Sequence, residues 1–548
     1  MTTNLMARAC RAALAAALAC GAAFVTLAAS PADASAAVPG TAPTLVQGAT
    51  DLGPAPGASV TLTLVLPLQD RAGLDQLLAS LYQPSSPDYH RFLTPAAFDT
   101  QFAPSPATLA SVESWAASAG LSVVSVSANR TLVRLSGPAS AVGRAFGVSF
   151  DQFRTPQGLT YVSNSTPASV PAALNGDLAA VVGLSSLGQV SLAPVLAPSS
   201  SASSSGLAYP TSYDPQQFWS FYDAPAAHTG AGQTIAVLAE GDLSQPKADL
   251  ATFEKTYGLP TVPWSTVATG PASSDTSGND EWDLDTQYST GMAQDVSSLL
   301  VYDAPSLSNS DILNEMNTWV TGDQAKQADF SAGECELLAD ASGFLTANDQ
   351  VLAQAVAQGQ TLFTAAGDTG AFCPALVGVN GVPAGLPNVN YPASSPYAVG
   401  VGGTTILGGP APLREIGWYA GGGGESLLEP APADQAAVGG SSLGVTRGVP
   451  DVAFDADPES GFDVIVGGQP TVVGGTSGGG PSWLGIWARA QADHGGGLGF
   501  AGDTVYAEPA SAFNDITVGD NGIYPCTPGY DYVTGRGTPD IAAFVADA

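Results

Sequence analysis

Residues 349–370 read DQVLAQAVAQGQTLFTAAGDTG, and this stretch decides the fold class. Its first ten residues have the spacing of a helix, and the run 361–365 is typical of a short buried strand. The same alternation is expected over the preceding residues, with strands at 233–239, 300–302 and 325–331 and helices at 247–257 and 285–299. Strands and helices that alternate at this spacing predict an α/β domain with a doubly wound parallel sheet.

The loop after the strand at 361–365 is a candidate site, because active sites of doubly wound sheets lie at the carboxyl ends of strands. It reads Gly367-Asp368-Thr369-Gly370. A protonated Asp368 can donate a hydrogen bond to an oxyanion, whereas an ionised one can only accept. The alternative is an ordinary aspartate in a turn.

A glycine-rich octamer at 474–481 contains a candidate nucleophile. It reads GGTSGGGP, a G-T-S-x-x-x-P pattern around Ser477. Glycines permit tight backbone conformations that leave a serine hydroxyl accessible. The apolar run 482–488 predicts a buried helix, so Ser477 would precede a helix N-terminus, where developing negative charge is stabilised. The alternative is a glycine-rich surface turn with an incidental serine.

A serine nucleophile needs a base, and the chain has three histidines. Two of them, His228 and His494, fall in the half of the chain that contains Ser477, and neither has the H-G-T-x-x-A-G context of a subtilisin histidine. Glu281 and Asp285, in contrast, are four residues apart and share one face of a helix. Carboxylates this close share a proton and their pKa values split, which suits a base for acid conditions. The alternative is a solvated acidic helix face.

The N-terminus predicts an exported protein. Arg8 and Arg11 precede an apolar run at 12–29, and residues 34–36 read Ala-Ser-Ala, a cleavage site of the A-x-A type. A membrane anchor is the alternative, because the run is near the lower spanning length. No later stretch reaches that length, so we expect a secreted, extracellular protein with no membrane contact once the signal is removed.

The chain is strongly acidic. It has 15 Lys+Arg against 48 Asp+Glu, a net charge of −33, and residues 207–548 hold 39 of the acidic side chains. Such a surface argues against nucleic acid as a partner, because phosphate contacts need Lys and Arg. The charge fits a protein that works in acid, where carboxylates protonate, and equally fits plain solubility or adaptation to salt.

The 548 residues predict more than one domain. Residues 60–153 mix strands and short helices, which indicates a compact α+β unit. Residues 197–206 read APSSSASSSG and predict a flexible linker that proteases can reach. Three cysteines follow the signal, so one disulfide and one spare thiol are expected in an oxidising compartment.

Taken together, these motifs resemble those of the sedolisin family of serine-carboxyl peptidases, which includes kumamolisin and tripeptidyl-peptidase I. Four segments carry the resemblance: E-x-x-x-D at 281–285, G-D-x-G at 367–370, Y-P-A-S-x-P…V-G-G-T within 390–404, and S-G-T-S-x-x-x-P at 474–481 with glycine for its first serine. The resemblance implies a subtilisin-like catalytic domain. In it, Ser477 is the nucleophile, Glu281 is the base, Asp285 orients Glu281, and Asp368 completes the oxyanion hole.

The same resemblance implies a Ca²⁺ loop within 514–535. The implied ligands are the carboxylates of Asp515 and Asp531 and the main-chain carbonyls of Ile516, Thr527 and Gly529, a donor set that suits a hard cation. Thr527 stands where the family usually has glycine. Without the resemblance, this stretch reads as an acidic loop with turn signals.

The resemblance covers nearly the whole chain after the signal. It implies a signal peptide at 1–36, an α+β, ferredoxin-like activation prodomain at 37–196, a linker at 197–206 and a peptidase domain at 207–548. The implied protein is a monomeric, secreted endopeptidase that acts on polypeptides in acid and is made as a self-processing zymogen, with its own prodomain as intramolecular inhibitor. The alternatives are an exopeptidase of the same family that releases tripeptides and an inactive binding protein on the same fold.

Three further features bear on how this chain compares with the family. Ala332 stands where the family often has a tryptophan. In the family, this tryptophan and a glutamate that would align with Glu240 together support the catalytic glutamate. A Cys373–Cys526 bridge, similar to one in tripeptidyl-peptidase I, is implied. Residues 377–386 are glycine-rich and leave the specificity open.

Charge also suggests how the prodomain is released. Residues 37–206 contain six arginines, which are expected to pair with carboxylates of the acidic peptidase domain near neutral pH. Acid protonates carboxylates but not arginine, so it would weaken these pairs and release the prodomain. The linker at 197–206 is then the expected place of cleavage, and the mature enzyme would begin near Leu207.

Overall fold

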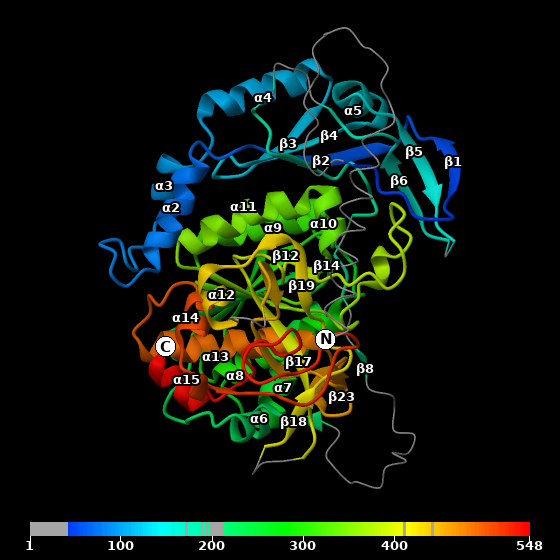
Figure 1. Cartoon of the computed structure of the whole chain (residues 1–548). Coiled ribbons are helices and arrows are strands. Elements are labelled where there is room, and N and C mark those ends of the chain that lie inside the picture. The colour runs from blue at the N-terminus through cyan, green and yellow to red at the C-terminus, as the bar shows by residue number, and fades with distance from the viewer. Residues whose placement is uncertain are drawn as a thin grey trace.

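The computed structural model describes residues 42–548 except 157, 170–173, 175, 189, 193–194, 197–211, 409–412 and 440–442. The expected signal peptide at 1–36 and linker at 197–206 therefore lie outside the described residues. Figure 1 shows an N-terminal part, blue to cyan, that lies over a C-terminal part, green to red. None of the helices in the described ranges is long and apolar enough to cross a membrane.

The C-terminal part is built on an eight-stranded sheet. The strand order is β11 (Trp264–Ala268), β12 (Ser298–Ala304), β10 (Thr234–Glu240), β13 (Gln327–Phe330), β15 (Thr361–Ala365), β17 (Val399–Ile406) and β18 (Glu415–Gly417), and β21 (Val452–Asp455) also pairs with β17. All pairs are parallel except β17 with β18. The predicted doubly wound parallel sheet is confirmed.

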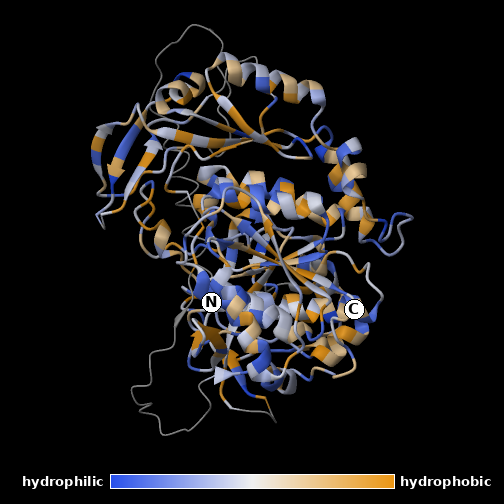
Figure 2. Cartoon of the chain, turned by 180° about the vertical axis from the view of Figure 1, so that it is seen from behind, coloured by the Kyte–Doolittle hydropathy of each residue, from blue (hydrophilic) through white to orange (hydrophobic). Residues whose placement is uncertain are grey.

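Both faces of this sheet are covered, as strand β10 illustrates. Its residues Ile235 and Val237 belong to one hydrophobic core, and Ala236 and Leu238 belong to another. Successive side chains of a strand point to opposite faces, so both faces are buried. The first core is completed by helices α7 (Ser244–Tyr257), α8 (Asn279–Ala293) and α13 (Gly479–Asp493), and the second by α9 (Asn309–Gly322) and α11 (Phe344–Ala357). Figure 2 shows the strands as a predominantly hydrophobic layer in the middle of this part.

Helices α8 and α13 pack closely side by side. A Cβ atom added at Gly485 of α13 would lie 2.6 Å from the Ala293 nitrogen of α8, so the close approach requires glycine. Helix α8 begins six residues earlier than the predicted helix at 285–299. It also ends earlier, because Gln294 and Asp295 have φ angles of 51° and 71°, which do not continue a helix.

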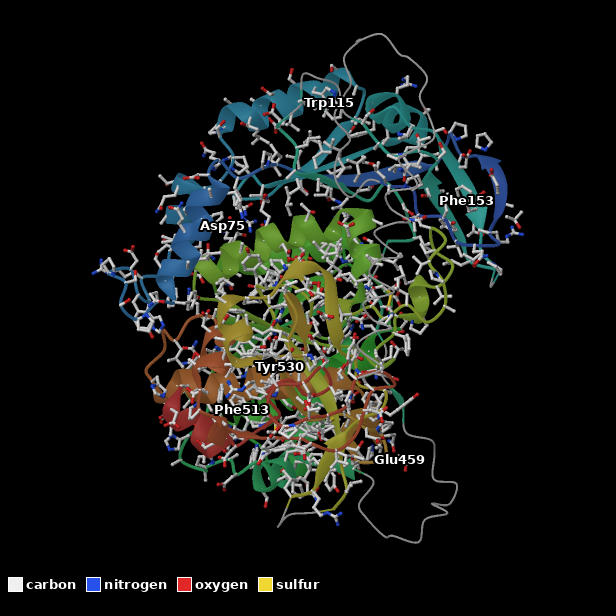
Figure 3. All side chains as sticks on the ribbon, in the orientation of Figure 1. Asp75, Trp115, Phe153, Glu459, Phe513 and Tyr530 are labelled. Atoms are coloured by element: carbon white, nitrogen blue, oxygen red, sulfur yellow. A yellow bond between two sulfur atoms is a disulfide. The ribbon has the colours of Figure 1, made fainter. Side chains whose placement is uncertain are left out.

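The N-terminal part contains a four-stranded antiparallel sheet with the order β3-β4-β2-β7. Its elements run β2 (Ser59–Val65), α4 (Pro106–Ser118), β3 (Ser122–Val126), β4 (Leu132–Pro138), α5 (Ala139–Phe146) and β7 (Ala180–Val182). This β-α-β-β-α-β order is that of ferredoxin-like folds, as predicted. Trp115 of α4, labelled in Figure 3, packs edge-on against Phe146 of α5 at 5.4 Å between ring centroids.

The remaining elements extend these two units. The N-terminal part adds α2 (Arg71–Leu81), α3 (Pro95–Gln101) and a sheet of β1 (Thr50–Pro54), β5 (Phe150–Arg154) and β6 (Thr160–Asn164). The C-terminal part adds α6 (Pro215–Phe221), α10 (Glu336–Ser342), α12 (Ala433–Gly439), α14 (Ala501–Ala507), α15 (Ile541–Asp547), β9 (Ser212–Tyr213), β14 (Glu334–Cys335), β16 (Asn390–Tyr391), β19 (Gly424–Pro430), β20 (Thr446–Val449), β22 (Gly461–Val466), β23 (Gln469–Gly474), β24 (Phe513–Asn514) and β25 (Thr538–Pro539). Strand β8 (Val195–Leu196) lies between the two parts in sequence.

The contact between the two parts is largely uncharged, contrary to the expected set of arginine pairs. The Asn129 amide donates to Asn317 Oδ1 at 2.9 Å and to Gln354 Oε1 at 2.8 Å. Among the described residues, Arg134 is the one arginine of the N-terminal part that forms a salt bridge across the contact, to Asp311 at 2.5 Å. Protonation of carboxylates in acid would therefore break few charge pairs between the two parts.

The cysteine pairing differs from the prediction. Cys335 and Cys373 form the disulfide, with their Cα atoms 5.7 Å apart, and Cys526 is free and buried. Cys526 packs with Ile516 and Val533 in a separate small core, away from the loop that contains Cys373. One disulfide and one thiol are present as expected, but the Cys373–Cys526 pairing was wrong.

Candidate active site

Ser477 lies at the start of helix α13. It belongs to a short 3-10 turn, Thr476–Gly478, that leads directly into the helix. Gly475 before it has a φ of 133°, which only glycine adopts readily. The Ser477 hydroxyl donates to the Ser331 carbonyl at 3.4 Å, and the Ser331 hydroxyl donates to the Ser477 carbonyl at 3.2 Å. These contacts place the serine between the N-terminus of α13 and the carboxyl end of β13.

Glu281 and Asp285 lie on α8, which runs alongside α13, and both are fully buried. Burial raises the pKa of Glu281; the nearby Ser477 hydroxyl opposes this effect, and the charge of Asp368 adds to it. The Ser477 hydroxyl is thus close enough to Glu281 to influence its pKa, although the hydroxyl donates its hydrogen bond to the Ser331 carbonyl. The structure brings the predicted base and the predicted nucleophile together.

Asp368 lies on the loop after β15, beside the nucleophile turn. Its Oδ1 atom accepts hydrogen bonds from the main-chain N–H and the hydroxyl of Thr476, both at 2.8 Å. Its Oδ2 atom is shielded from solvent and has no hydrogen-bond partner within the described part of the chain. Burial raises the pKa of Asp368 to about 6, although the two bonds from Thr476 oppose the shift. Oδ2 is therefore free to hold a proton and donate it to a ligand.

Asp329, at the end of β13, is a fourth buried carboxyl that the sequence analysis missed. Its charge is the largest ionic influence on Asp285, whose pKa burial raises first and Asp329 raises further. Asp329 Oδ2 lies 3.1 Å from the Ser331 hydroxyl, which also bonds to the Ser477 carbonyl. One hydroxyl has one proton to donate to these two acceptors, so Asp329 satisfies the network when it is protonated and donates to Ser331.

In this arrangement the pKa values of Glu281 and Asp368 stand in the wrong order for the expected reaction. The pKa of Glu281 is raised further than that of Asp368, because Asp368 has two donors from Thr476 that favour its ionised form. A reaction that uses Glu281 as base and Asp368 as proton donor needs the opposite order. A carbonyl oxygen that gains negative charge beside Asp368 would raise the pKa of Asp368 and so favour that order.

The other titratable candidates lie elsewhere. His228 pairs with Asp493, His494 contacts the Val545 carbonyl, and His90 stacks on Tyr89. Burial, together with the nearby charges of Asp275 and Asp303, raises the pKa of Glu240 to about 7, and none of these neighbours is a candidate catalytic group. Ala332, where the resemblance implied a supporting tryptophan, is buried in the second core of the sheet.

A cavity of about 600 Å³ opens beside these residues. It is lined by the catalytic candidates Ser477 and Asp368, by the disulfide Cys335–Cys373, and by residues of the N-terminal part that include Val46 and Ser191. The N-terminal part therefore forms one wall of the cavity.

Two short stretches at the end of the N-terminal part pair with residues beside the site. Ser191 forms an antiparallel bridge with Gly333, with hydrogen bonds of 2.9 and 3.2 Å. Strand β8 (Val195–Leu196) pairs antiparallel with β23, where Val195 lies opposite Gly474. Gly333 is two residues from Ser331, and Gly474 is three residues before Ser477, so Ser191 and Val195 each pair with a residue close in sequence to the groups around the nucleophile.

The predicted Ca²⁺ ligands converge on one turn. The Asp515 carboxylate accepts from the Gly529 N–H at 3.1 and 3.2 Å, and the Asp531 carboxylate accepts from the Thr527 N–H at 2.9 Å. Within the described residues, the carbonyls of Ile516, Thr527 and Gly529 have no hydrogen-bond donor of the protein. Two carboxylates beside free carbonyls form an oxygen-rich donor set that fits Ca²⁺.

Comparisons with known proteins identify the family. Residues 47–187 match the family model described as the Pro-kumamolisin activation domain. The chain is 33% identical to sedolisin of Pseudomonas sp. (strain 101) over 90% of its length and 87% of that protein, and 33% identical to kumamolisin of Bacillus sp. (strain MN-32) over 74% of its length and 76% of that protein. Among solved structures it is similar to Pseudomonas sedolisin, a serine-carboxyl proteinase complexed with two molecules of pseudo-iodotyrostatin, with a TM-score of 0.57 and 34% identity over 61% of this chain and 97% of that one. The chain therefore belongs to the sedolisin family of serine-carboxyl peptidases and carries an N-terminal activation domain.

Proposed function

We propose that this chain is a secreted endopeptidase that acts in acid, is made as a zymogen and processes itself through an acyl-enzyme on Ser477. The observation that carries the proposal is a pair of main-chain contacts near Ser477: Ser191 pairs with Gly333, and β8 (Val195–Leu196) pairs with β23. A polypeptide substrate bound in the same extended way would place a peptide bond next to the Ser477 hydroxyl.

Each carboxyl has a role in the proposed reaction. The Ser477 oxygen attacks the substrate carbonyl carbon while Glu281 accepts the hydroxyl proton, and protonated Asp285 orients Glu281. Protonated Asp368 donates a hydrogen bond to the oxyanion. The C–N bond then breaks, Glu281 returns the proton to the leaving amine, and water hydrolyses the acyl-enzyme by the same steps. In mild acid the proposed reaction needs protonated Asp285 and Asp368 beside an ionised Glu281, whereas a histidine in the place of Glu281 would be charged and unable to accept the proton.

The same pairings support self-processing and suggest where the cut would fall. Because Ser191 pairs near Ser331 and Val195 pairs just before the Ser477 turn, we expect the bond cleaved in the precursor to lie between these two residues. This position is upstream of the linker at 197–206 that the sequence favours. Further trimming of that linker in solution would then give a mature N-terminus near Leu207.

An open cleft favours an endopeptidase over an exopeptidase that releases tripeptides. The precursor's own chain pairs beside the site at Ser191, with Gly333, and again at Val195, with Gly474, so both positions accept an extended backbone. An exopeptidase would need one of these ends to be blocked.

We further propose that Asp515, Asp531 and the carbonyls of Ile516, Thr527 and Gly529 hold a Ca²⁺ ion. The ion would neutralise the two carboxylates and fix the turn at 527–531, and the proposed reaction does not pass through it. Secretion by the signal at 1–36 and a monomeric state complete the proposal.

One experiment tests the activity. The purified full chain is incubated with a reduced, alkylated protein at pH values from 3 to 8, and the ends of the products are sequenced. The proposal expects internal cleavage that is fastest in acid. Release of tripeptides alone from substrate N-termini would support the exopeptidase instead, and no hydrolysis at any pH would support the inactive binding protein.

A further inference from the structure

The loop from Cys373 to Pro387 contains a binding edge that the catalytic groups do not use. Its residues Gly378 to Asn380 pair with residues Leu45 to Gln47, near the start of the described chain, and Val46 lies opposite Val379 in an antiparallel bridge. Figure 1 shows this loop, in yellow-green, reaching up beside strand β6 of the N-terminal part.

Three hydrogen bonds hold the pair together. The Gln47 N–H donates to the Gly378 carbonyl at 2.6 Å, and the Asn380 N–H donates to the Leu45 carbonyl at 2.8 Å. The Leu45 N–H donates to Asn380 Oδ1 at 3.0 Å. Two of the three bonds use main-chain groups on both sides, so the edge recognises an extended backbone rather than a particular side chain.

The edge keeps its shape through bonds within its own loop. The Gly378 N–H donates to the Val382 carbonyl and the Val382 N–H donates to the Val379 carbonyl, both at 2.9 Å. The disulfide Cys335–Cys373 and the buried side chain of Leu376 fix the base of the loop in a small core of its own. The edge is therefore formed by the C-terminal part and does not depend on the strand that covers it.

The edge is continuous with the active-site cavity. Val377 and Val379 line the same cavity of about 600 Å³ as Ser477 and Asp368. When the N-terminal part leaves, the Gly378 carbonyl and the Asn380 N–H lose their partners, and buried Val379 loses the cover of Val46. A chain long enough to pass through the cavity can reach these groups.

We infer that residues Gly378 to Asn380 form a second docking site for the substrate, which binds an extended segment of an unfolded polypeptide by antiparallel main-chain pairing. In the precursor, Leu45 to Gln47 occupy this site, so the activation domain covers it together with the catalytic groups. The inference rests on the proposed peptidase activity and assigns this loop a preference for long, unfolded chains over short peptides.

A competitor peptide tests the inference. The enzyme, activated from the full chain in acid, is assayed on a reduced, alkylated protein and on a short peptide that spans the cleavage site only. The probe is a blocked synthetic peptide with the sequence of residues 42–49, APTLVQGA. The control peptide has proline at the place of Gln47, because proline lacks the N–H that bonds to Gly378.

The expected result is a difference between the two substrates. The probe should raise the KM for the protein about fivefold at saturation and leave the short peptide unaffected, since loss of one or two hydrogen bonds of ordinary strength corresponds to roughly this factor. The proline peptide should have no effect. Inhibition of both substrates would place the probe in the cleft, and inhibition of neither would show that the edge binds no chain; either outcome overturns the inference.

A variant of the loop gives an independent readout. Asn380→Gly keeps the main-chain N–H and tolerates the observed φ of 48°, and removes only the Oδ1 acceptor. It should raise the KM for the protein about threefold, with kcat and the short-peptide constants unchanged. Asp323→Gly, at a position that also has a φ of 48° but lies at the end of α9, is the matched control and should change nothing. A full chain that never becomes active would contradict the proposed function itself, whereas an active enzyme with equal KM changes on both substrates would contradict only the docking site.

Discussion

The four carboxyl groups around Ser477 differ in what holds their protons. Glu281, Asp285 and Asp329 are fully buried, and burial is the first cause that raises each pKa. Asp285 lies close to Asp329 and Glu281, and a negative charge on either raises its pKa further, so Asp285 keeps its proton when one of these two ionises. A cluster of this kind can supply one base and several hydrogen-bond donors at the same pH.

Amide substitutions on α8 separate catalytic from structural carboxyls. Glu281→Gln and Asp285→Asn should each lower kcat by several orders of magnitude, roughly the scale known for members of catalytic triads, without preventing folding. Asp283→Asn is the matched control, because Asp283 is a buried carboxyl on the same helix that contacts Gln287 instead of the site. Kinetics with a peptide substrate measure the effect. If all three variants keep near-full activity, the pair is only part of an acidic helix.

Asp368 should set the alkaline limit of activity. Its pKa is about 6, so it is protonated and able to donate below that pH, and it loses the proton as the pH rises through that value. The activity of the enzyme should therefore fall above pH about 6. In Asp368→Asn the amide remains a donor at every pH, so the variant should be slower but should lose this fall. A pH profile of kcat/KM, which reports the groups of the free enzyme, measures both, and an identical alkaline fall in the variant would exclude Asp368 as its cause.

Sequence reasoning found the residues that stand in distinctive local patterns. Ser477 is surrounded by glycines, Asp368 follows a strand, and Glu281 and Asp285 have helical spacing. Asp329 was missed because it stands inside an apparently ordinary strand, and its proximity to Asp285 arises only when β13 packs against α8. The disulfide partner was wrong for the same reason, since the path of a long loop brings Cys335 to Cys373 and local sequence does not encode that path.

At the scale of elements, the order of strands and helices in both parts was predictable from periodicity. The residues at which individual elements begin and end were less predictable. Helix α8 is an example: its apolar pattern continues to residue 299, but positive φ angles at Gln294 and Asp295 end the helix. The six-residue shift matters for function, because it extends α8 upstream and places Glu281 in its first turn.

The C-terminal loop should respond to removal of Ca²⁺. Asp531 is buried, and burial raises its pKa to about 6 in the absence of a cation, so a bound ion would relieve an unfavourable ionisation. Exhaustive chelation should lower the Tm, because an ion that binds only the folded state stabilises it by mass action. Asp531→Ala should lower the Tm at least as much, because it also removes the acceptor of the Thr527, Val533 and Thr534 N–H groups, and it should no longer respond to chelation. The prediction fails if the wild-type Tm is unchanged after chelation.

At the scale of the whole molecule, buried carboxyls should make the fold more stable in acid. Burial raises the pKa of Glu334 and Asp503 to about 8 and that of Asp283 to about 9. A carboxyl whose pKa is raised by folding contributes fully below its unfolded value of about 4, and this contribution is lost as the pH rises through the folded value. The net charge of −33 at pH 7 adds repulsion in the same direction.

The Tm should therefore fall as the pH rises from about 4 to about 9. Calorimetry of the Ser477→Ala full chain measures this without self-digestion. The variant Asp503→Asn should lose part of the fall, because it removes one ionisation of raised pKa. A Tm that is higher at pH 8 than at pH 5 would contradict the assignment of these groups as buried acids.

The arrangement of the two parts makes activation a property of the whole chain. The activation domain is held mainly by uncharged contacts, with Arg134–Asp311 as the salt bridge across them in the described ranges, so acid alone weakens the contact only in part. Cleavage between Ser191 and Val195 would remove the covalent link as well.

Self-processing of the purified precursor tests the central claim most directly. The full chain is moved from pH 7 to pH 4, and its intact mass and new N-terminus are followed by mass spectrometry, with Ser477→Ala as the control. The account predicts a first cut between Ser191 and Val195 that occurs in acid, proceeds at a rate independent of protein concentration, and is absent from the Ser477→Ala chain. Cleavage of the Ser477→Ala chain at the same rate, or a first cut far from these residues, would contradict it.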